Sequence, residues 1–185
     1  MFLSITVTSG NAMSKPIWIV RDYLKCTGCR RCEIACSLFH EGWIWPEASR
    51  IRVFMPFPGL EVPHLCAQCD DYPCVKSCPV EAISIDDKTT AVLVDRDKCT
   101  GCGLCIKACP GSIPFLHPKD GKATICDLCN GDPQCTKVCT KGGWNTLRRV
   151  SRDSDYSYKL YARKPEEITK SLLTIIYGEK GEELI

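Results

Sequence analysis

The spacing of its cysteines constrains this chain more than any other feature. Of its 185 residues, 16 are cysteine, and they form four groups of four. The groups are Cys26, Cys29, Cys32 and Cys36; Cys66, Cys69, Cys74 and Cys78; Cys99, Cys102, Cys105 and Cys109; and Cys126, Cys129, Cys135 and Cys139. Groups one and three read C-x2-C-x2-C-x3-C, while groups two and four lengthen only the middle gap, to four and five residues. Such regular spacing indicates that cysteine chemistry holds the fold together.

The repeated C-x2-C-x2-C segment is typical of a loop that binds a 4Fe-4S cluster. Three thiolates two residues apart on one loop can reach three irons of a single cluster. The fourth cysteine lies about one helical turn beyond the third, and in two-cluster ferredoxins it ligates the other cluster. Gly28, Gly101 and Gly103 let the loop backbone approach a cluster and point N–H groups at its sulfurs. The sequence therefore predicts four 4Fe-4S clusters.

Two other metal assignments compete with four clusters. Zinc at every site is disfavoured because zinc ribbons use two C-x2-C pairs and do not need a third cysteine. Pro79 and Pro110 complete the terminal Cys-Pro of groups two and three, whereas groups one and four end in Ser37 and Thr140. Three clusters plus one atypical metal site, built on the first three cysteines of group four, is therefore an alternative.

The thiols are expected to be reduced and the chain to be cytoplasmic. Its first fifteen residues lack an early basic group and a continuous apolar stretch, so they do not read as a secretory signal, and Met13 is an alternative start to Met1. The apolar runs Ile17–Val20 and Leu172–Tyr177 are too short to span a membrane, so no direct membrane insertion is expected. In a reducing compartment, sixteen thiols indicate metal rather than disulfides.

The segments between the cysteine groups predict an α+β fold of two nested bacterial-ferredoxin-like units, each binding two clusters. Ala82–Ile85 and Ala91–Asp95 alternate like the two strands of a hairpin, as between the two motifs of a ferredoxin. We therefore expect an inner unit over residues 65–110, inserted in an outer unit of residues 16–64 plus 111–150. Residues 1–15 would form an N-terminal tail. A tandem order, with group one beside two and three beside four, fits the spacing as well.

Residues 151–185 contain no cysteine and are interpreted as a C-terminal docking segment. Pro165 and the acidic residues after it predict a helix that runs through Leu172 and stops at Gly178. This helix would contact a partner subunit or pack on its own domain. The three histidines lie beside complete cysteine groups and are expected to be structural.

The sequence resembles the four-cluster electron-transfer subunits of molybdenum and tungsten oxidoreductases. The string His64–Pro79, which reads HLCAQCDDYPCVKSCP, and the downstream CDLC carry the resemblance, which extends from about Ile17 to Trp144. The resemblance implies two ferredoxins, one inserted in the other, and four ligand sets that each borrow one cysteine from another group. The implied sets are Cys26, Cys29, Cys32 and Cys139; Cys36, Cys126, Cys129 and Cys135; Cys66, Cys69, Cys74 and Cys109; and Cys78, Cys99, Cys102 and Cys105.

The resemblance also implies an electron-transfer role. The chain is most similar in size and plan to the subunits of tungsten-dependent benzoyl-CoA reductase and aldehyde oxidoreductase. A larger tungsten or molybdenum pterin catalytic subunit is then its expected partner, with a further redox partner such as ferredoxin or a flavin subunit. The sequence has no nucleotide loop or nucleophile elbow, so the chain is not expected to be an enzyme by itself. Alternatives are a free-standing soluble polyferredoxin or a subunit of a formate dehydrogenase, hydrogenase or dimethyl sulfoxide reductase complex.

The formal net charge of +2 treats every cysteine as neutral. Sixteen thiolates and four oxidised cores of about +2 each would bring the net charge to about −6. Nucleic-acid binding needs a concentrated basic patch and is not expected. A zinc-stapled interaction module is the alternative outside redox chemistry, and metal content separates it from an iron-sulfur protein.

Overall fold

The computed structural model describes residues 16–152 and 158–184, so the tail predicted over residues 1–15 lies outside the described residues. The strands are β1 Ile17–Arg21, β2 Arg52–Phe57, β3 Leu60–His64, β4 Ile83–Ile85, β5 Val92–Val94, β6 Phe115–Leu116, β7 Ala123–Thr124 and β8 Leu147–Ser151. The α-helices are α1 Arg31–Glu41, α2 Pro73–Lys76, α3 Leu104–Ala108, α4 Gln134–Lys141 and α5 Pro165–Tyr177. Short 3-10 helices cover Tyr23–Lys25, Pro46–Ala48, Leu128–Gly131, Tyr158–Tyr161 and Gly178–Leu184. The described strands pair only in twos, which confirms a mixed fold of short helices and small sheets.

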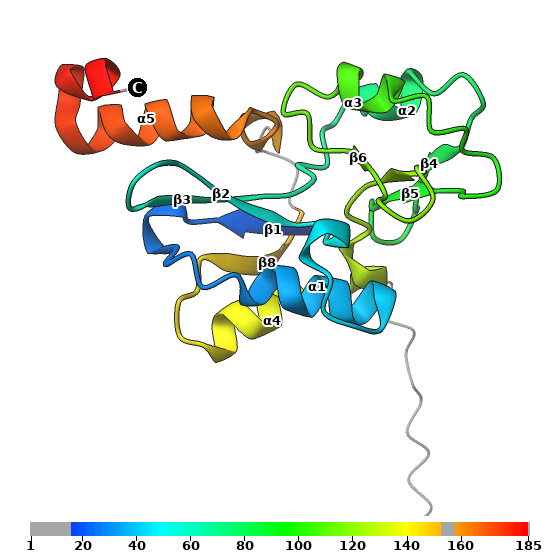
Figure 1. The fold of residues 1–185 in the computed structure, drawn as a ribbon, viewed down its shortest axis with the longest axis horizontal. Coiled ribbons are helices and arrows are strands. Elements are labelled where there is room, and N and C mark those ends of the chain that lie inside the picture. The colour runs from blue at the N-terminus through cyan, green and yellow to red at the C-terminus, as the bar shows by residue number, and fades with distance from the viewer. Residues whose placement is uncertain (1–15, 153–157, 185) are drawn as a thin grey trace, which may run out of the picture.

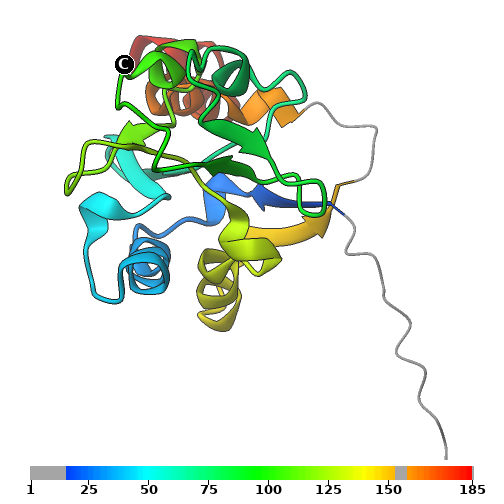
Figure 2. The same ribbon diagram turned by 90° about the vertical axis from the view of Figure 1, so that its right-hand side faces the viewer.

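The two ends of the cysteine-containing region pair with each other. β1 runs antiparallel to β8, with Ile17 opposite Ser151 and Arg21 opposite Leu147. α1 and α4 lie side by side below this ribbon (Figures 1 and 2). Ile19 and Leu147 pack in the apolar core that joins these elements. Cysteine groups one and four, whose last cysteines lie on α1 and α4, are thereby brought together.

The middle of the chain forms a second assembly around another apolar core. β4 and β5 pair with Ile83 opposite Val94, which confirms the hairpin predicted between Ala82 and Asp95. α2 and α3 contact each other above this hairpin (Figure 1). Ala82, Ile83 and Val92 are buried together with cysteines of groups two and three.

The C-terminal helix covers the β2–β3 hairpin. α5 begins at Pro165 and is followed by Gly178, as the sequence predicts. Ile168 and Leu172 of α5 are buried against Val62 of β3, and the helix lies along this hairpin in Figure 1. None of the helices in the described part of the chain is long and apolar enough to cross a membrane.

Candidate iron-sulfur sites

All sixteen cysteines lie among the described residues, and all are free thiols. Cys29 and Cys102 are exposed, whereas every other cysteine is buried or half-buried. The fold therefore collects soft thiol donors in its interior, which is the donor type that iron-sulfur clusters require.

Two quartets of cysteines line cavities. Cys26, Cys29, Cys32 and Cys139 line one cavity, although Cys26 and Cys139 lie 113 positions apart in the sequence. A second cavity is lined by Cys66, Cys69, Cys74 and Cys109. Each quartet combines three cysteines of one group with the last cysteine of another.

A third quartet lies between α1 and the segment that leads into α4. Burial raises the pKa of the Cys135 thiol well above its usual value, and Cys126, Cys36, Cys129 and Cys32 raise it further by charge repulsion. Such effects indicate that the sulfur atoms of these cysteines lie near Cys135. Cys36, Cys126, Cys129 and Cys135 are all buried.

The remaining four cysteines gather near the β4–β5 hairpin. Burial raises the pKa of Cys105, and the neighbouring Cys102 and Cys99 add to this shift. Cys78 packs against the apolar core that contains Cys99 and Cys105. The same core also contains Cys74, so Cys78 lies near cysteines of both group two and group three.

The last cysteine of every group accepts a backbone N–H bond at its sulfur. The donors are Arg50 N to Cys36 at 3.3 Å, Ala82 N to Cys78 at 3.3 Å, Ile113 N to Cys109 at 3.4 Å and Leu147 N to Cys139 at 3.4 Å. These bonds stabilise negative charge on sulfur, and such bonds help set the reduction potential of a cluster. Ala82 and Ile113 each lie four residues after the sulfur they contact, a regularity that could be found in the sequence.

The glycines in the cysteine loops are needed for backbone conformation. Gly28 and Gly101 have φ angles of +65° and +71°, a region that other residues rarely adopt. A Cβ atom on Gly101 would lie 2.4 Å from the carbonyl oxygen of Gly121. These two positions therefore require glycine for the local backbone, independently of how closely a cluster approaches.

The cysteine sites fit a cluster better than they fit free thiols. Burial raises the pKa of Cys32 and Cys66 to about 12, and that of Cys74 to about 11. Thiolates in such apolar pockets need a compensating cation, and metal binding deprotonates a coordinating thiol. Four thiols around one cavity supply the donor number and type of a 4Fe-4S site.

Metal content provides the first test of this assignment. Protein purified without oxygen should be brown and contain about sixteen iron and sixteen sulfide per chain, because four cysteine quartets are complete. Metal and sulfide analysis measures both values. About twelve iron would support the atypical site built on the fourth group, and stoichiometric zinc with little iron would exclude the cluster assignment.

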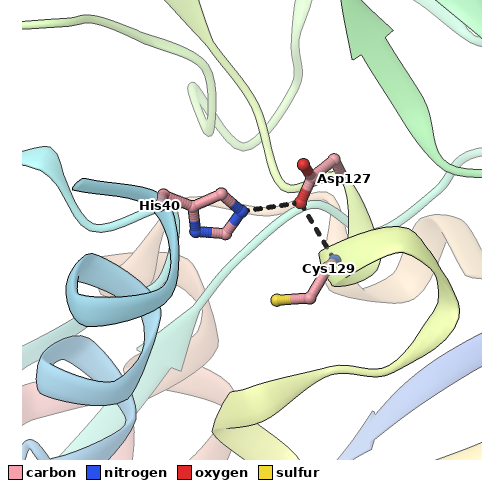
Figure 3. A group of neighbouring side chains, drawn as sticks. All are labelled: His40, Asp127 and Cys129. Atoms are coloured by element: carbon pink, nitrogen blue, oxygen red, sulfur yellow. Dashed lines mark hydrogen bonds and ion pairs between the residues drawn. The ribbon is translucent and has the colours of Figure 1, made fainter. Parts of the chain in front are cut away.

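One polar network contacts the third quartet. His40 of α1 donates from Nε2 to Asp127 Oδ1 at 3.0 Å, and its Nδ1 lies 2.8 Å from Cys36 O and 3.6 Å from Cys36 Sγ. Asp127 also accepts from the backbone N–H of Cys129 at 3.0 Å (Figure 3). The Asp127 carboxylate pairs in addition with the Arg50 guanidinium. Ligand atoms of His40, Asp127 and Cys129 lie within 4.8 Å of one another.

This network shifts the pKa values of its members in opposite directions. Burial would raise the pKa of Asp127, but the His40 hydrogen bond and the Arg50 charge lower it below its usual value. Burial would lower the pKa of His40, but hydrogen bonds to Asp127 and Cys36 raise it to about 9. The network therefore stabilises a carboxylate between two cationic groups.

Two of the three histidines bond to groups other than cysteine in the described part of the chain. His64 Nε2 lies 3.1 Å from the carbonyl oxygen of Arg163, and His117 is buried against Glu41. His40 differs because it contacts a predicted ligand. The sequence held a signal for this contact, since His40 lies four residues after Cys36 on the same helix.

Two protein families and several known proteins are similar to this chain. Residues 59–149 match the 4Fe-4S dicluster domain family, and residues 23–38 match a 4Fe-4S binding domain. The polyferredoxin-like subunit of the aliphatic sulfonate oxidoreductase of Pyrococcus furiosus is 49% identical over 163 residues, covering 88% of this chain and 94% of that protein. The thiosulfate reductase electron transfer subunit of Salmonella typhi is 31% identical over 146 residues, covering 70% and 74%. Among solved structures, the active-site complex BamBC of benzoyl coenzyme A reductase with 1,5-dienoyl-CoA aligns with a TM-score of 0.45 and 27% identity, covering 90% and 94% of the two chains.

Proposed function

This chain belongs to the polyferredoxin-like iron-sulfur subunits of oxidoreductase complexes, and we propose that it relays single electrons through four 4Fe-4S clusters to or from a separate catalytic subunit. Its relatives are named as electron-transfer or polyferredoxin-like subunits, and its family matches assign it several 4Fe-4S clusters. When bound, such clusters supply one-electron transfer. The chain's own part is to hold them, to set their spacing and to tune their potentials.

The observation that carries the proposal is the proximity of cysteines from different groups, which supports a continuous row of the four proposed ligand sets. Cys32 of the first cavity acts on the pKa of Cys135 in the third quartet. Cys126 of that quartet is in turn affected by Cys66 of the second cavity. Cys66 also packs against the apolar core that contains Cys99. The two exposed cysteines, Cys29 and Cys102, belong to the two quartets at the ends of this row, where electrons could enter and leave.

Within this proposal, each cluster takes three cysteines from one group and the last cysteine of another. The sets are Cys26, Cys29, Cys32 and Cys139; Cys36, Cys126, Cys129 and Cys135; Cys66, Cys69, Cys74 and Cys109; and Cys78, Cys99, Cys102 and Cys105. The two lined cavities and the mutual pKa effects support these sets. The four N–H bonds to the last cysteines would hold each borrowed sulfur in place.

The same contacts support the nested domain order. The β1–β8 ribbon and the α1–α4 pair hold residues 16–64 and 111–150 together. The β4–β5 hairpin and the α2–α3 pair organise residues 65–110. Residues 151–185 remain the proposed docking segment, because Ile175, Ile176 and Tyr177 of α5 are exposed although α5 packs on its own domain.

The proposed catalytic partner carries a tungsten or molybdenum pterin, as the resemblance in the cysteine strings implies. The relative that matches nearly the whole chain serves an aliphatic sulfonate oxidoreductase. Thiosulfate and tetrathionate reductase subunits are further relatives. These names favour a partner that acts on an oxidised sulfur compound over the formate dehydrogenase alternative, whose subunit is 28% identical. Aldehyde oxidoreductase and benzoyl-CoA reductase partners, a second redox partner and a cytoplasmic location stay predictions.

Native purification tests the subunit role. The chain should co-elute with a larger subunit that contains tungsten or molybdenum and a pterin, because its sites carry electrons and not substrate. Size-exclusion chromatography under argon, followed by metal analysis and native mass spectrometry of each fraction, measures this. Recovery of the isolated chain alone at low and moderate ionic strength would favour a free-standing polyferredoxin.

A further inference from the structure

Cys36 Sγ has an unusually polar environment for a buried sulfur. It accepts from the backbone N–H of Arg50 at 3.3 Å, and His40 Nδ1 lies 3.6 Å away. Burial would raise the pKa of the Cys36 thiol, but these two neighbours lower it below its usual value. Within the described residues, it is the one cysteine sulfur for which a histidine ring nitrogen is found as a hydrogen-bonding neighbour.

The donors around Cys36 are held by a single carboxylate. Asp127 Oδ1 accepts from His40 Nε2 at 3.0 Å, and Asp127 Oδ2 pairs with the Arg50 guanidinium. The side chains of His40, Asp127 and Arg50 are only 6%, 17% and 20% exposed. Their charges are therefore weakly screened by solvent. Asp127 lies directly after Cys126 and bonds to the N–H of Cys129, so the same carboxylate ties the network to two further cysteines of the quartet.

We propose that Arg50, His40 and Asp127 form a positioning network that raises the reduction potential of the cluster to which Cys36 contributes. The proposal rests on the ligand set given above for Cys36, Cys126, Cys129 and Cys135. Reduction adds negative charge to a cluster and its sulfurs, so nearby N–H donors and cations stabilise the reduced state. Arg50 supplies both a backbone donor to Cys36 and a charge that compensates Asp127.

The direction of the effect does not depend on the protonation of His40. An arginine side chain stays charged at accessible pH. Without the Arg50 guanidinium, the Asp127 carboxylate would be uncompensated beside the cluster and would disfavour the added electron. Arg50→Met should therefore lower the potential, while the backbone N–H to Cys36 is retained. His40→Gln removes the ring whose Nε2–H bonds to Asp127, so this carboxylate is less compensated beside the cluster and the potential should fall as well.

Potentiometric titration of the holoprotein, followed by electron paramagnetic resonance, tests this inference. Cys36→Ser first identifies which of the cluster signals depends on Cys36. Arg50→Met and His40→Gln should then move the midpoint of that signal to lower potential and leave the other midpoints in place. Arg50→Lys keeps the positive charge, so its midpoint potential should stay close to that of the unmodified protein. Arg163→Met is the matched control, because it also removes a guanidinium and the Arg163 side chain bonds to Glu167 and Ser171 of α5.

The possible outcomes are distinct. If Arg50→Met and His40→Gln both kept their full iron content and an unchanged midpoint potential, the proposal would be overturned. The proposed four-cluster relay would be unaffected by that result. Loss of about four iron in both variants would assign the network a purely structural role and would also overturn it. An unmodified protein with only about twelve iron and no signal that depends on Cys36 would instead contradict the four-cluster relay itself.

Discussion

Removing the iron is expected to abolish the cooperative unfolding transition of this protein. Its two largest apolar cores contain cysteines alongside ordinary hydrophobic residues, so the metal sites lie inside the cores. The sheets in the described part of the chain have two strands each, and α2 and α3 have only four and five residues. Isolated helices shorter than about 12–15 residues and lone hairpins are marginal in water. Little of the cysteine-containing region can therefore persist alone.

The free energies involved indicate that removal of the iron unfolds the cysteine-containing region completely and does not merely loosen it. Domains of this kind are stable by about 5–15 kcal/mol. A structural metal site can contribute about 10–16 kcal/mol of folding free energy, as in zinc fingers. Losing several sites therefore exceeds the whole stability of the chain, even if each contributes much less than this.

The experiment compares holoprotein, protein treated with a chelator and reductant, and protein treated with reductant alone. Circular dichroism during heating should show a cooperative transition for the first and third samples and none for the second. Reconstitution with iron and sulfide should restore the transition. A treated sample that is free of iron and still unfolds cooperatively at the original midpoint would show that the apolar cores suffice.

Local features of this fold could be predicted from the sequence because their signals are local. The β4–β5 hairpin follows from alternation between Ala82 and Asp95, and α5 follows from Pro165 at its start and Gly178 after its end. The cysteine spacing pointed to iron-sulfur chemistry, and the family matches confirm it. In each case the residues that decide the structure lie within a few turns of one another.

Long-range contacts could not be predicted in the same way. Nothing in Ile17–Arg21 specifies Leu147–Ser151 as its partner strand, since both are short and many pairings satisfy the same alternation. The contact between His40 and Asp127 joins residues 87 positions apart. The sequence signals the contact between His40 and Cys36, which lie one helical turn apart on α1, but gives no signal for the contact with Asp127.

Cys78→Ser is expected to alter the same cluster signal as Cys102→Ser. Three hydrogen bonds lead from Cys78 to Cys99 through the hairpin. Ala82 N donates to Cys78 Sγ at 3.3 Å, Asp95 N donates to Ala82 O at 2.7 Å, and Cys99 N donates to Asp95 O at 3.0 Å. These bonds support the prediction that Cys78 contributes to the cluster of group three.

Electron paramagnetic resonance of four variants distinguishes the nested order of the cysteine groups from the tandem order. In the nested order, Cys78→Ser and Cys102→Ser change or remove one common signal, with loss of at most about four iron each. Cys69→Ser and Cys29→Ser then change two other signals and serve as matched controls, because each also replaces one cysteine by serine in a different quartet. In the tandem order, Cys78→Ser would share its signal with Cys29→Ser. That result would refute the nested order. A serine at position 78 can perturb the cluster of Cys29 directly only if group two lies beside group one.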